Sequence, residues 1–195
     1  MTRVFVARLA GLRVFDPLGD QVGRVSDVVV QFSSRRKAPR VIGLVVEVAG
    51  RRRVFVPMTR VTSVDAGQVI TTGLVNMRRF EQRTSETLVI AELFERNIGV
   101  RTPDETFDAV VEDLAMEQER NRDWFIAKVF ARTGSGGSRS ISSLGRRRGE
   151  TVLVDIDQVT GLQLDAEGQS AAKLLESYEG LKAADLAELI HDLSP

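Results

Sequence analysis

A repeated run of short, valine-rich segments constrains the fold of this chain more than any other feature. In residues 11–61, apolar stretches alternate with turn-type clusters, and a similar order of segments begins again at Ile98. At a shift of 86 residues, residues 25–28 align with residues 111–114. Chance similarity among valine-rich strands is the alternative explanation. A repeat of this length is typical of a duplicated domain rather than of a solenoid.

The spacing of the apolar segments predicts a mainly β protein. Residues 22–32, 40–48 and 53–57 are rich in Val, Ile or Phe, and clusters of Gly, Pro, Ser or charged residues bound them. Short strands at this spacing favour a small antiparallel barrel or sandwich. Pro57 has no N–H to donate, so we expect its strand to end there or to lie at a sheet edge. Gly23 is expected where a strand bends or lies close to another backbone.

We therefore expect two small antiparallel barrels in tandem, followed by a helical hairpin. The expected bounds are a first barrel over residues 1–75, a linker over 76–87, a second and diverged barrel over 88–168, and a helical segment over 169–195. Residues 76–83 are interpreted as a short helix or linker, and Ser85 as the N-cap of a further helix. Residues 132–149 are mostly Gly, Ser and Arg, and we expect this insertion to be mobile because it has little apolar surface to bury.

Composition narrows the classes of protein that the chain can represent. It has no cysteine, which excludes disulfides, thiolate catalysis and zinc sites built on sulfur, and which fits a cytoplasmic protein. Its apolar runs are much shorter than the roughly 20 residues of a membrane-spanning helix. Arg3 and Arg8 interrupt the first apolar stretch, so we expect no signal peptide.

Charge is balanced overall and unevenly distributed. Residues 1–100 hold 16 Lys and Arg against 9 Asp and Glu, which gives +7, and residues 101–195 hold 11 against 18, which gives −7. Opposite fields favour docking of the two halves on each other, or head-to-tail association between copies. An unselected surface composition is the alternative.

The first repeated unit resembles the PRC-barrel family, which occurs in the H subunit of photosynthetic reaction centres and in ribosome maturation factors. The resemblance is carried by a glycine-rich opening, a Gly-x-Val-x-Asp strand, an apolar strand and a closing Val-x-Val-Pro-x-x-x-Val segment, here Gly11, Val14, Gly19, Gly23, Val25, Asp27, residues 41–48, Val54, Val56, Pro57 and Val61. The second unit departs from the pattern, with Ala109 in place of Gly23 and Asp155 in place of Pro57.

The end of the chain resembles a second family. Residues 174–195 contain Lys182-Ala-Ala-Asp-Leu-Ala-Glu-Leu189 and end in Leu-Ser-Pro, and this segment is similar to the opening of the intracellular N domain of MgtE magnesium transporters. The resemblance implies a regulatory or scaffolding protein linked to magnesium transport, peripheral to a membrane through a partner. It transfers no magnesium ligand, because the sensing carboxylates of such transporters lie largely beyond the matching stretch.

Asp155 and Asp157 are the candidate metal ligands in this sequence. They lie two residues apart in a predicted strand and would project from one face, where two carboxylates can hold a weakly bound hydrated magnesium or calcium ion. The alternative is a solvated outer face opposite Val152, Val154 and Ile156.

Three basic clusters are candidates for contact with a partner or with nucleic acid. They are Arg51, Arg52 and Arg53, then Arg35, Arg36 and Lys37, and finally Arg146, Arg147 and Arg148. If the first two clusters shared one end of a barrel, they would form a basic rim for phosphate or RNA. Solvated loops are the alternative, and one Trp and one Tyr make a poor stacking platform.

No residue set supports an enzyme. His191 is the single histidine and lies in a predicted helix end, without a serine and acid at a spacing that indicates a catalytic triad. Trp124 opens a predicted strand, where aromatic residues usually pack into the core. We expect a non-enzymatic interaction or regulatory module that binds a protein partner or itself. An RNA- or ribosome-associated factor is the alternative.

Overall fold

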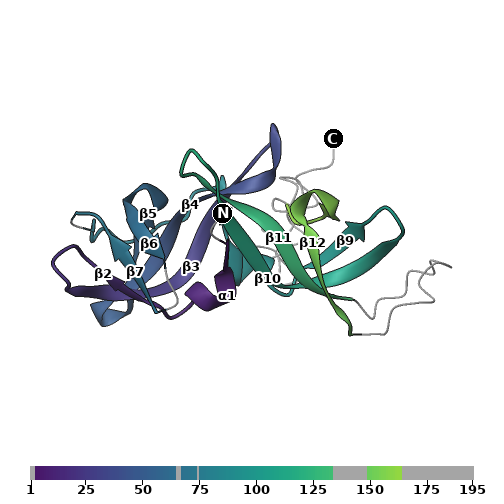
Figure 1. Ribbon diagram of the computed structural model, residues 1–195. Coiled ribbons are helices and arrows are strands. Elements are labelled where there is room, and N and C mark those ends of the chain that lie inside the picture. The colour runs from purple at the N-terminus through teal and green to yellow at the C-terminus, as the bar shows by residue number, and fades with distance from the viewer. Residues whose placement is uncertain (1–2, 65–66, 74, 134–148, 164–195) are drawn as a thin grey trace, which may run out of the picture. The chain divides into compact units, whose positions relative to one another are not determined.

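The computed structural model describes residues 3–64, 67–73, 75–133 and 149–163. These ranges are mainly β, as predicted (Figure 1). The strands are β1 (Arg3–Phe5), β2 (Arg13–Phe15), β3 (Gln21–Ser33), β4 (Arg36–Val48), β5 (Arg52–Pro57), β6 (Val61–Val64), β7 (Gln68–Thr71), β8 (Glu86–Leu88), β9 (Asn97–Arg101), β10 (Thr106–Gln118), β11 (Trp124–Thr133), β12 (Thr151–Asp155) and β13 (Val159–Thr160). Short helical turns lie between them: α1 (Val6–Leu9), the 3-10 turns η1 (Ala49–Arg51), η2 (Met58–Arg60) and η5 (Ile156–Gln158), and the π-helical turn η3 (Val89–Leu93).

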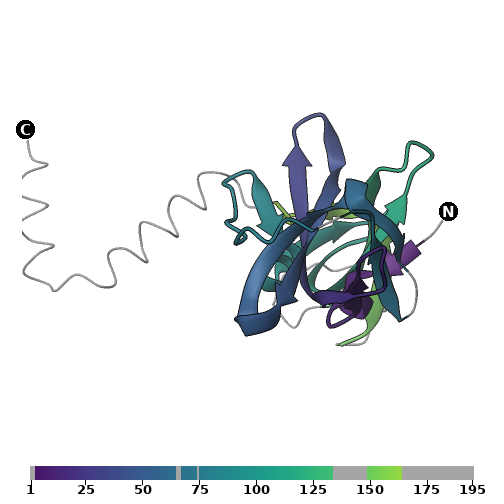
Figure 2. The same cartoon turned by 90° about the vertical axis from the view of Figure 1, so that its left-hand side faces the viewer.

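The strands join into one open sheet of 13 strands rather than into two separate closed barrels. The main path runs β13-β9-β10-β11-β4-β3-β2-β7-β6, and β1, β5, β8 and β12 are added beside it. The expectation of two independent barrels missed this continuity. β11 and β4 pair through Trp124 with Val41 and through Phe125 with Arg40, so the ladder passes from one half of the chain to the other. The long strands are strongly curved (Figure 2).

The same ladder is built twice, and we call β2–β7 the first repeat and β9–β13 the second repeat. Asp27 on β3 lies opposite Val45, and Asp113 on β10 lies opposite Phe130, each directly after a bulge. The alignment nevertheless differs from the sequence-based one at the start of each repeat. Val14 faces Gly23 and Ile98 faces Ala109, so Ile98 corresponds to Val14, whereas the predicted shift of 86 paired it with Leu12.

The segments that lead into the two repeats are exchanged. β1 precedes the first repeat but pairs with β10 of the second, and β8 precedes the second repeat but pairs with β3 of the first. The predicted helix start at Ser85 is therefore wrong. Glu86–Leu88 is extended because it pairs with residues 29–31 of β3, and only the five residues of η3 are helical.

One hydrophobic core extends through both repeats and both leading segments. Leu9 of α1 and Leu93 of η3 are fully buried in it, together with Leu44 and Leu114 from the long strands. Trp124 is buried as well, at 6% exposure, as predicted. Because the apolar residues of the leading turns are buried with those of the long strands, the exchange is stabilised by packing as well as by strand pairing.

Gly23 lies where another backbone comes close, as predicted. A Cβ at this position would collide with the carbonyl oxygen of Glu47 and would lie 2.9 Å from Val46 Cγ1. β5 ends at Pro57, also as predicted. Residues 76–83 contain no helix. Within them, Arg79 forms an antiparallel bridge with Val54 of β5, and Phe80 N–H donates to the Arg53 carbonyl at 2.8 Å.

Some expectations concern residues outside the described ranges. The helical hairpin over residues 169–195, and residues 134–148 of the predicted mobile insertion, fall there. Arg132 and Thr133, which were assigned to that insertion, instead end strand β11. Among the described residues, no helix has the length and apolar character required to cross a membrane.

Candidate functional site

Two aspartates, the buried Asp27 and the half-buried Asp113, hold the segments that connect the repeats. Asp27 sits on β3, where its Oδ1 accepts hydrogen bonds from Val28 N–H at 2.7 Å and from Ile90 N–H at 2.8 Å. Its Oδ2 accepts from Ala91 N–H at 3.0 Å. The carboxylate thus binds two backbone amides of η3, the turn that leads into the second repeat.

Asp113 makes the corresponding contacts in the second repeat. Its Oδ1 accepts from Leu114 N–H at 2.7 Å and from Ala7 N–H in α1 at 3.0 Å. Removal from water raises the pKa of both Asp27 and Asp113 above its ordinary value, and the hydrogen bonds to the backbone oppose that rise. Both carboxylates are therefore structural groups that hold the exchanged turns.

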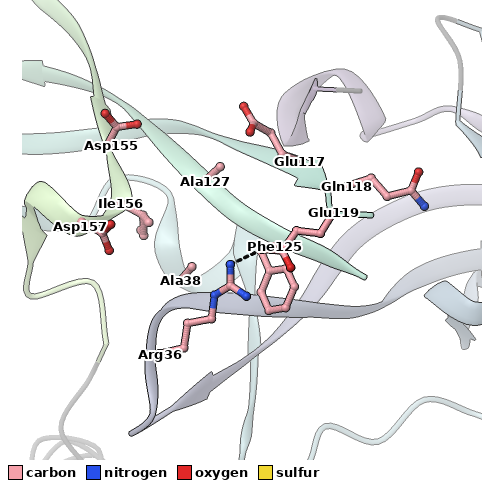
Figure 3. Close-up of a pocket in the computed structure, with 10 residues that line it drawn as sticks. All are labelled: Arg36, Ala38, Glu117, Gln118, Glu119, Phe125, Ala127, Asp155, Ile156 and Asp157. Atoms are coloured by element: carbon pink, nitrogen blue, oxygen red, sulfur yellow. Dashed lines mark hydrogen bonds and ion pairs between the residues drawn. The ribbon is translucent and has the colours of Figure 1, made fainter. Parts of the chain in front are cut away.

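A groove of about 390 Å³ lies where β4 meets the second repeat (Figure 3). The guanidinium of Arg36 lies 3.8 Å from the centroid of the Phe125 ring and forms an ion pair with Glu119. Beside this groove, Arg40 Nη2 contacts Asp123 Oδ1 at 2.6 Å. Bases of the first half of the chain thus meet acids of the second half, as the uneven charge distribution predicted for docking of the two halves.

The predicted pair Asp155 and Asp157 lines the same groove but not as one face of a strand. Asp155 ends β12, whereas Asp157 lies in the 3-10 turn η5, so the two carboxylates come from different elements (Figure 3). Asp155 Oδ1 lies 2.5 Å from Lys128 Nζ, and the Asp157 carbonyl accepts from Lys37 Nζ at 3.0 Å. In the described ranges, no group of three or more His, Cys, Asp or Glu residues is arranged to hold a metal ion. Magnesium binding by this pair stays a prediction.

The two described basic clusters do not form a common rim. Arg36 begins β4 opposite Ser33, while Arg53 lies opposite Glu47 near the other end of the same long strand. The two clusters therefore do not share one end of a barrel, and the basic rim expected in that case does not form, because the 13 residues of β4 separate them. Arg51 and Arg52 are exposed at the start of β5. Arg146, Arg147 and Arg148 lie outside the described residues.

A different basic surface comes from the segment that follows the first repeat. A cleft of about 780 Å³ is lined by Arg60, Arg78, Arg79 and Arg83, and we call it the arginine cleft. Its apolar part includes Phe55 and Phe80, whose rings stack with centroids 6.0 Å apart and an interplanar angle of 20°. Arg78 and Arg79 are exposed, and in the described part of the chain neither side chain forms an ion pair.

The acids of the arginine cleft do not neutralise it. Glu81 and Glu86 are the acids among the described residues that line it, and neither forms an ion pair with Arg78 or Arg79. The Glu86 side chain is only 9% exposed and accepts a hydrogen bond from Arg83 N–H at 3.0 Å. Its contact with the Arg83 guanidinium is longer, at 3.9 Å. A surplus of positive charge beside stacked rings suits a ligand with anionic and apolar groups.

The first repeat contains the strand ladder, Gly23 where β3 and β4 come close together, and Pro57 at the end of β5. Residues 1–74 match the PRC-barrel domain model. This match covers the stretch in which the sequence resemblance was found. Residues 87–165 match a different family model, described as the actinomycetes SH3 domain, where a second PRC-like unit was expected. No match corresponds to the MgtE-like segment, and the comparison with curated proteins found none for the chain.

The arginine cleft was missed by the sequence-based selection of site residues. Arg78 and Arg79 follow the PRC-matched residues and were read as part of a linker. The available signal was the aromatic residue next to them, since Phe80 directly follows the two exposed arginines. This segment packs on β5 of the PRC-matched repeat through long-range contacts, and no local sequence pattern reveals such contacts.

Proposed function

We propose that this protein is a non-enzymatic interaction module that binds an acidic segment of a partner protein in the arginine cleft. The observation that carries the proposal is the surplus of exposed arginines beside the stacked pair Phe55 and Phe80. The residues given above supply charge and apolar surface, and they include no paired nucleophile and base.

Complementary charge gives such a surface its selectivity. Arg78 and Arg79 carry long, exposed cationic side chains. The hydrogen bond from the Phe80 amide anchors their segment to β5. An acidic segment would gain ion pairs with these side chains and would bury apolar residues against the rings. We expect the binding to weaken with salt, because the arginines are exposed.

RNA is the second class of ligand that a basic cleft attracts, and the same features favour a protein segment. Phe55 and Phe80 stack on each other and are only partly exposed, so they offer a limited surface on which an unpaired base can stack. The candidate cluster Arg51, Arg52 and Arg53 is separated from Arg36 by the length of β4, which removes a longer phosphate-binding track.

A link to magnesium transport is part of the proposal and rests on the sequence of residues 174–195 alone. In this view the protein is cytoplasmic, and it reaches a membrane through its partner. The finer architectural expectation, a small barrel in each repeat, is supported by the PRC match and by the matching ladders of the two repeats.

The test is a binding titration with a fluorescent peptide of alternating Glu and Leu, at about 50 mM salt. We expect the wild type to bind this peptide, and the double variant Arg78→Glu with Arg79→Glu to bind it at least about tenfold more weakly. A peptide with Gln in place of Glu is expected not to bind. The matched control is Arg101→Glu with Arg120→Glu, which makes the same charge change at exposed arginines of the second half.

Two results would overturn the proposal. One is equal loss of binding in both double variants, which would indicate a nonspecific charge effect. The other is a clear preference for an oligouridine probe over the acidic peptide, since that would make RNA the ligand of the arginine cleft.

A further inference from the structure

The two repeats differ in what covers their outer strand, and the difference identifies a docking edge. In the first repeat, β5 is covered on the side away from β4. Phe80 N–H donates to the Arg53 carbonyl, Arg79 forms an isolated antiparallel bridge with Val54, and the Phe80 ring stacks on Phe55. Residues 78–80 therefore act as one more short strand on β5.

β12 is the counterpart of β5 in the second repeat. Val154 pairs with Val129 of β11 as Val56 pairs with Leu44 of β4. A 3-10 turn follows in both cases, η5 after β12 and η2 after β5. By this register, Leu153 takes the place of Phe55, and Thr151 takes the place of Arg53.

The outer edge of β12 is open in the part of the chain that the structure describes. β12 pairs with β11 there and with no other strand. Asp155 N–H donates to the Gln158 side chain at 3.0 Å, so its backbone faces away from β11. Alternate residues of a strand face the same edge, which places the backbone groups of Thr151 and Leu153 on the open side. Leu153 is 45% exposed, although its counterpart Phe55 packs against Phe80.

We propose that β12 binds an extended segment of a partner protein by strand addition, in the register that residues 78–80 use on β5. The segment's main chain would pair with Thr151 and Leu153, and its aromatic side chain would cover Leu153. This surface is separate from the arginine cleft, so the inference does not depend on the proposed function.

Charges at the two ends of β12 specify the chemistry of the segment. Glu150 is exposed just before the strand, and the Asp155 side chain at its end is 60% exposed, while its Oδ1 contacts Lys128 Nζ at 2.5 Å. Continuing the register of the first repeat, Glu150 and Asp155 would face the positions that Glu81 and Asn76 hold opposite β5. The segment that fits therefore carries cations at both ends and an aromatic residue between them.

The experiment uses the full chain and the peptide Lys-Met-Arg-Arg-Phe-Lys, which copies residues 76–81 with lysines at its two ends. We expect saturable binding that Leu153→Asp weakens at least about tenfold, and slower hydrogen exchange of the Leu153 amide in the complex. The control variant is Leu18→Asp, because Leu18 is an exposed apolar residue on a distant turn, and it is expected to bind as wild type does. A comparison peptide with Glu at both ends is expected to bind less tightly.

Absence of binding, or binding that Leu153→Asp leaves unchanged, would overturn the inference. Self-association of the chain that Leu153→Asp abolishes, without peptide binding, would also overturn it, since the occupant would then be a second copy. Thermal melts of both variants verify that any loss of binding occurs in a folded protein.

Discussion

Asp27 and Asp113 occupy equivalent places in the two repeats, and each binds the backbone of the turn that leads into the other repeat. Asp27 reaches Ala91, 64 residues further along the chain, and Asp113 reaches Ala7, 106 residues back. Together with the exchanged strands β1 and β8, these contacts make each repeat depend on a segment that precedes the other. The exchanged segments therefore couple the two repeats.

Asp27→Ala is expected to lower the free energy of unfolding by about 1–3 kcal/mol, because it leaves the Ile90 and Ala91 amides without their acceptor in a part-buried site. Urea denaturation measures the change. Asp16→Ala is the control, since Asp16 also accepts two backbone N–H groups, those of Leu18 and Asp20, but in an exposed turn. Equal losses in the two variants would contradict the structural role of Asp27.

The pH dependence of stability follows from the raised pKa of Asp27. Because desolvation raises this pKa above its ordinary value of 3.8, the folded state binds the proton more tightly than the unfolded state. Stability contributed by Asp27 therefore rises as the pH falls through the raised pKa, and is lost above it. The stability of wild type relative to Asp27→Asn is expected to increase between neutral pH and mildly acidic pH in urea titrations. A decrease over that range would show that the backbone hydrogen bonds outweigh desolvation.

Gly23→Val is expected to destabilise the protein by about 1–3 kcal/mol, since a Cβ there would meet the Glu47 carbonyl and Val46 Cγ1. A thermal melt compares the variant with Gly67→Ala, whose added Cβ has no heavy atom within 4 Å. A Gly23→Val melt that coincides with that of wild type would mean that β3 and β4 are further apart at this point.

Arg36 and Glu119 are expected to couple across the junction. A double-mutant cycle with Arg36→Ala and Glu119→Ala should give about 0.5–1 kcal/mol, because the pair is partly exposed and the guanidinium also lies on Phe125. The comparison cycle is Arg132 with Glu95, where N and O are 3.9 Å apart and Glu95 is 77% exposed. If both cycles gave the same coupling, the ion pair at the junction would have no special role.

The extent to which the sequence predicted this fold depends on how local each signal is. β3, β4 and β5 were predicted because their valines lie in runs that turn-type residues bound, and Gly23 because it belongs to a motif. β1 and β8 have three residues each, too few to show a period, and their partners lie in the other repeat. Trp124 and Phe125 carry no local sign that they pair with β4.

The candidate sites follow the same division. Asp155 and Asp157 were chosen for their spacing in an assumed strand, and the turn η5 separates them. The arginine cleft and the open edge of β12 arise from packing of distant segments, so no spacing rule reveals them. The coverage of β5 and the open edge of β12 are features of the tertiary structure.

Differential scanning calorimetry of the full chain tests most directly whether the two repeats form one cooperative unit. We expect one transition for the β structure, with equal calorimetric and van't Hoff enthalpies, and we expect Asp27→Ala to shift that whole transition to lower temperature. Two resolved transitions for the repeats, of which Asp27→Ala shifts only one, would contradict the claim that the exchanged segments couple the repeats into one unit.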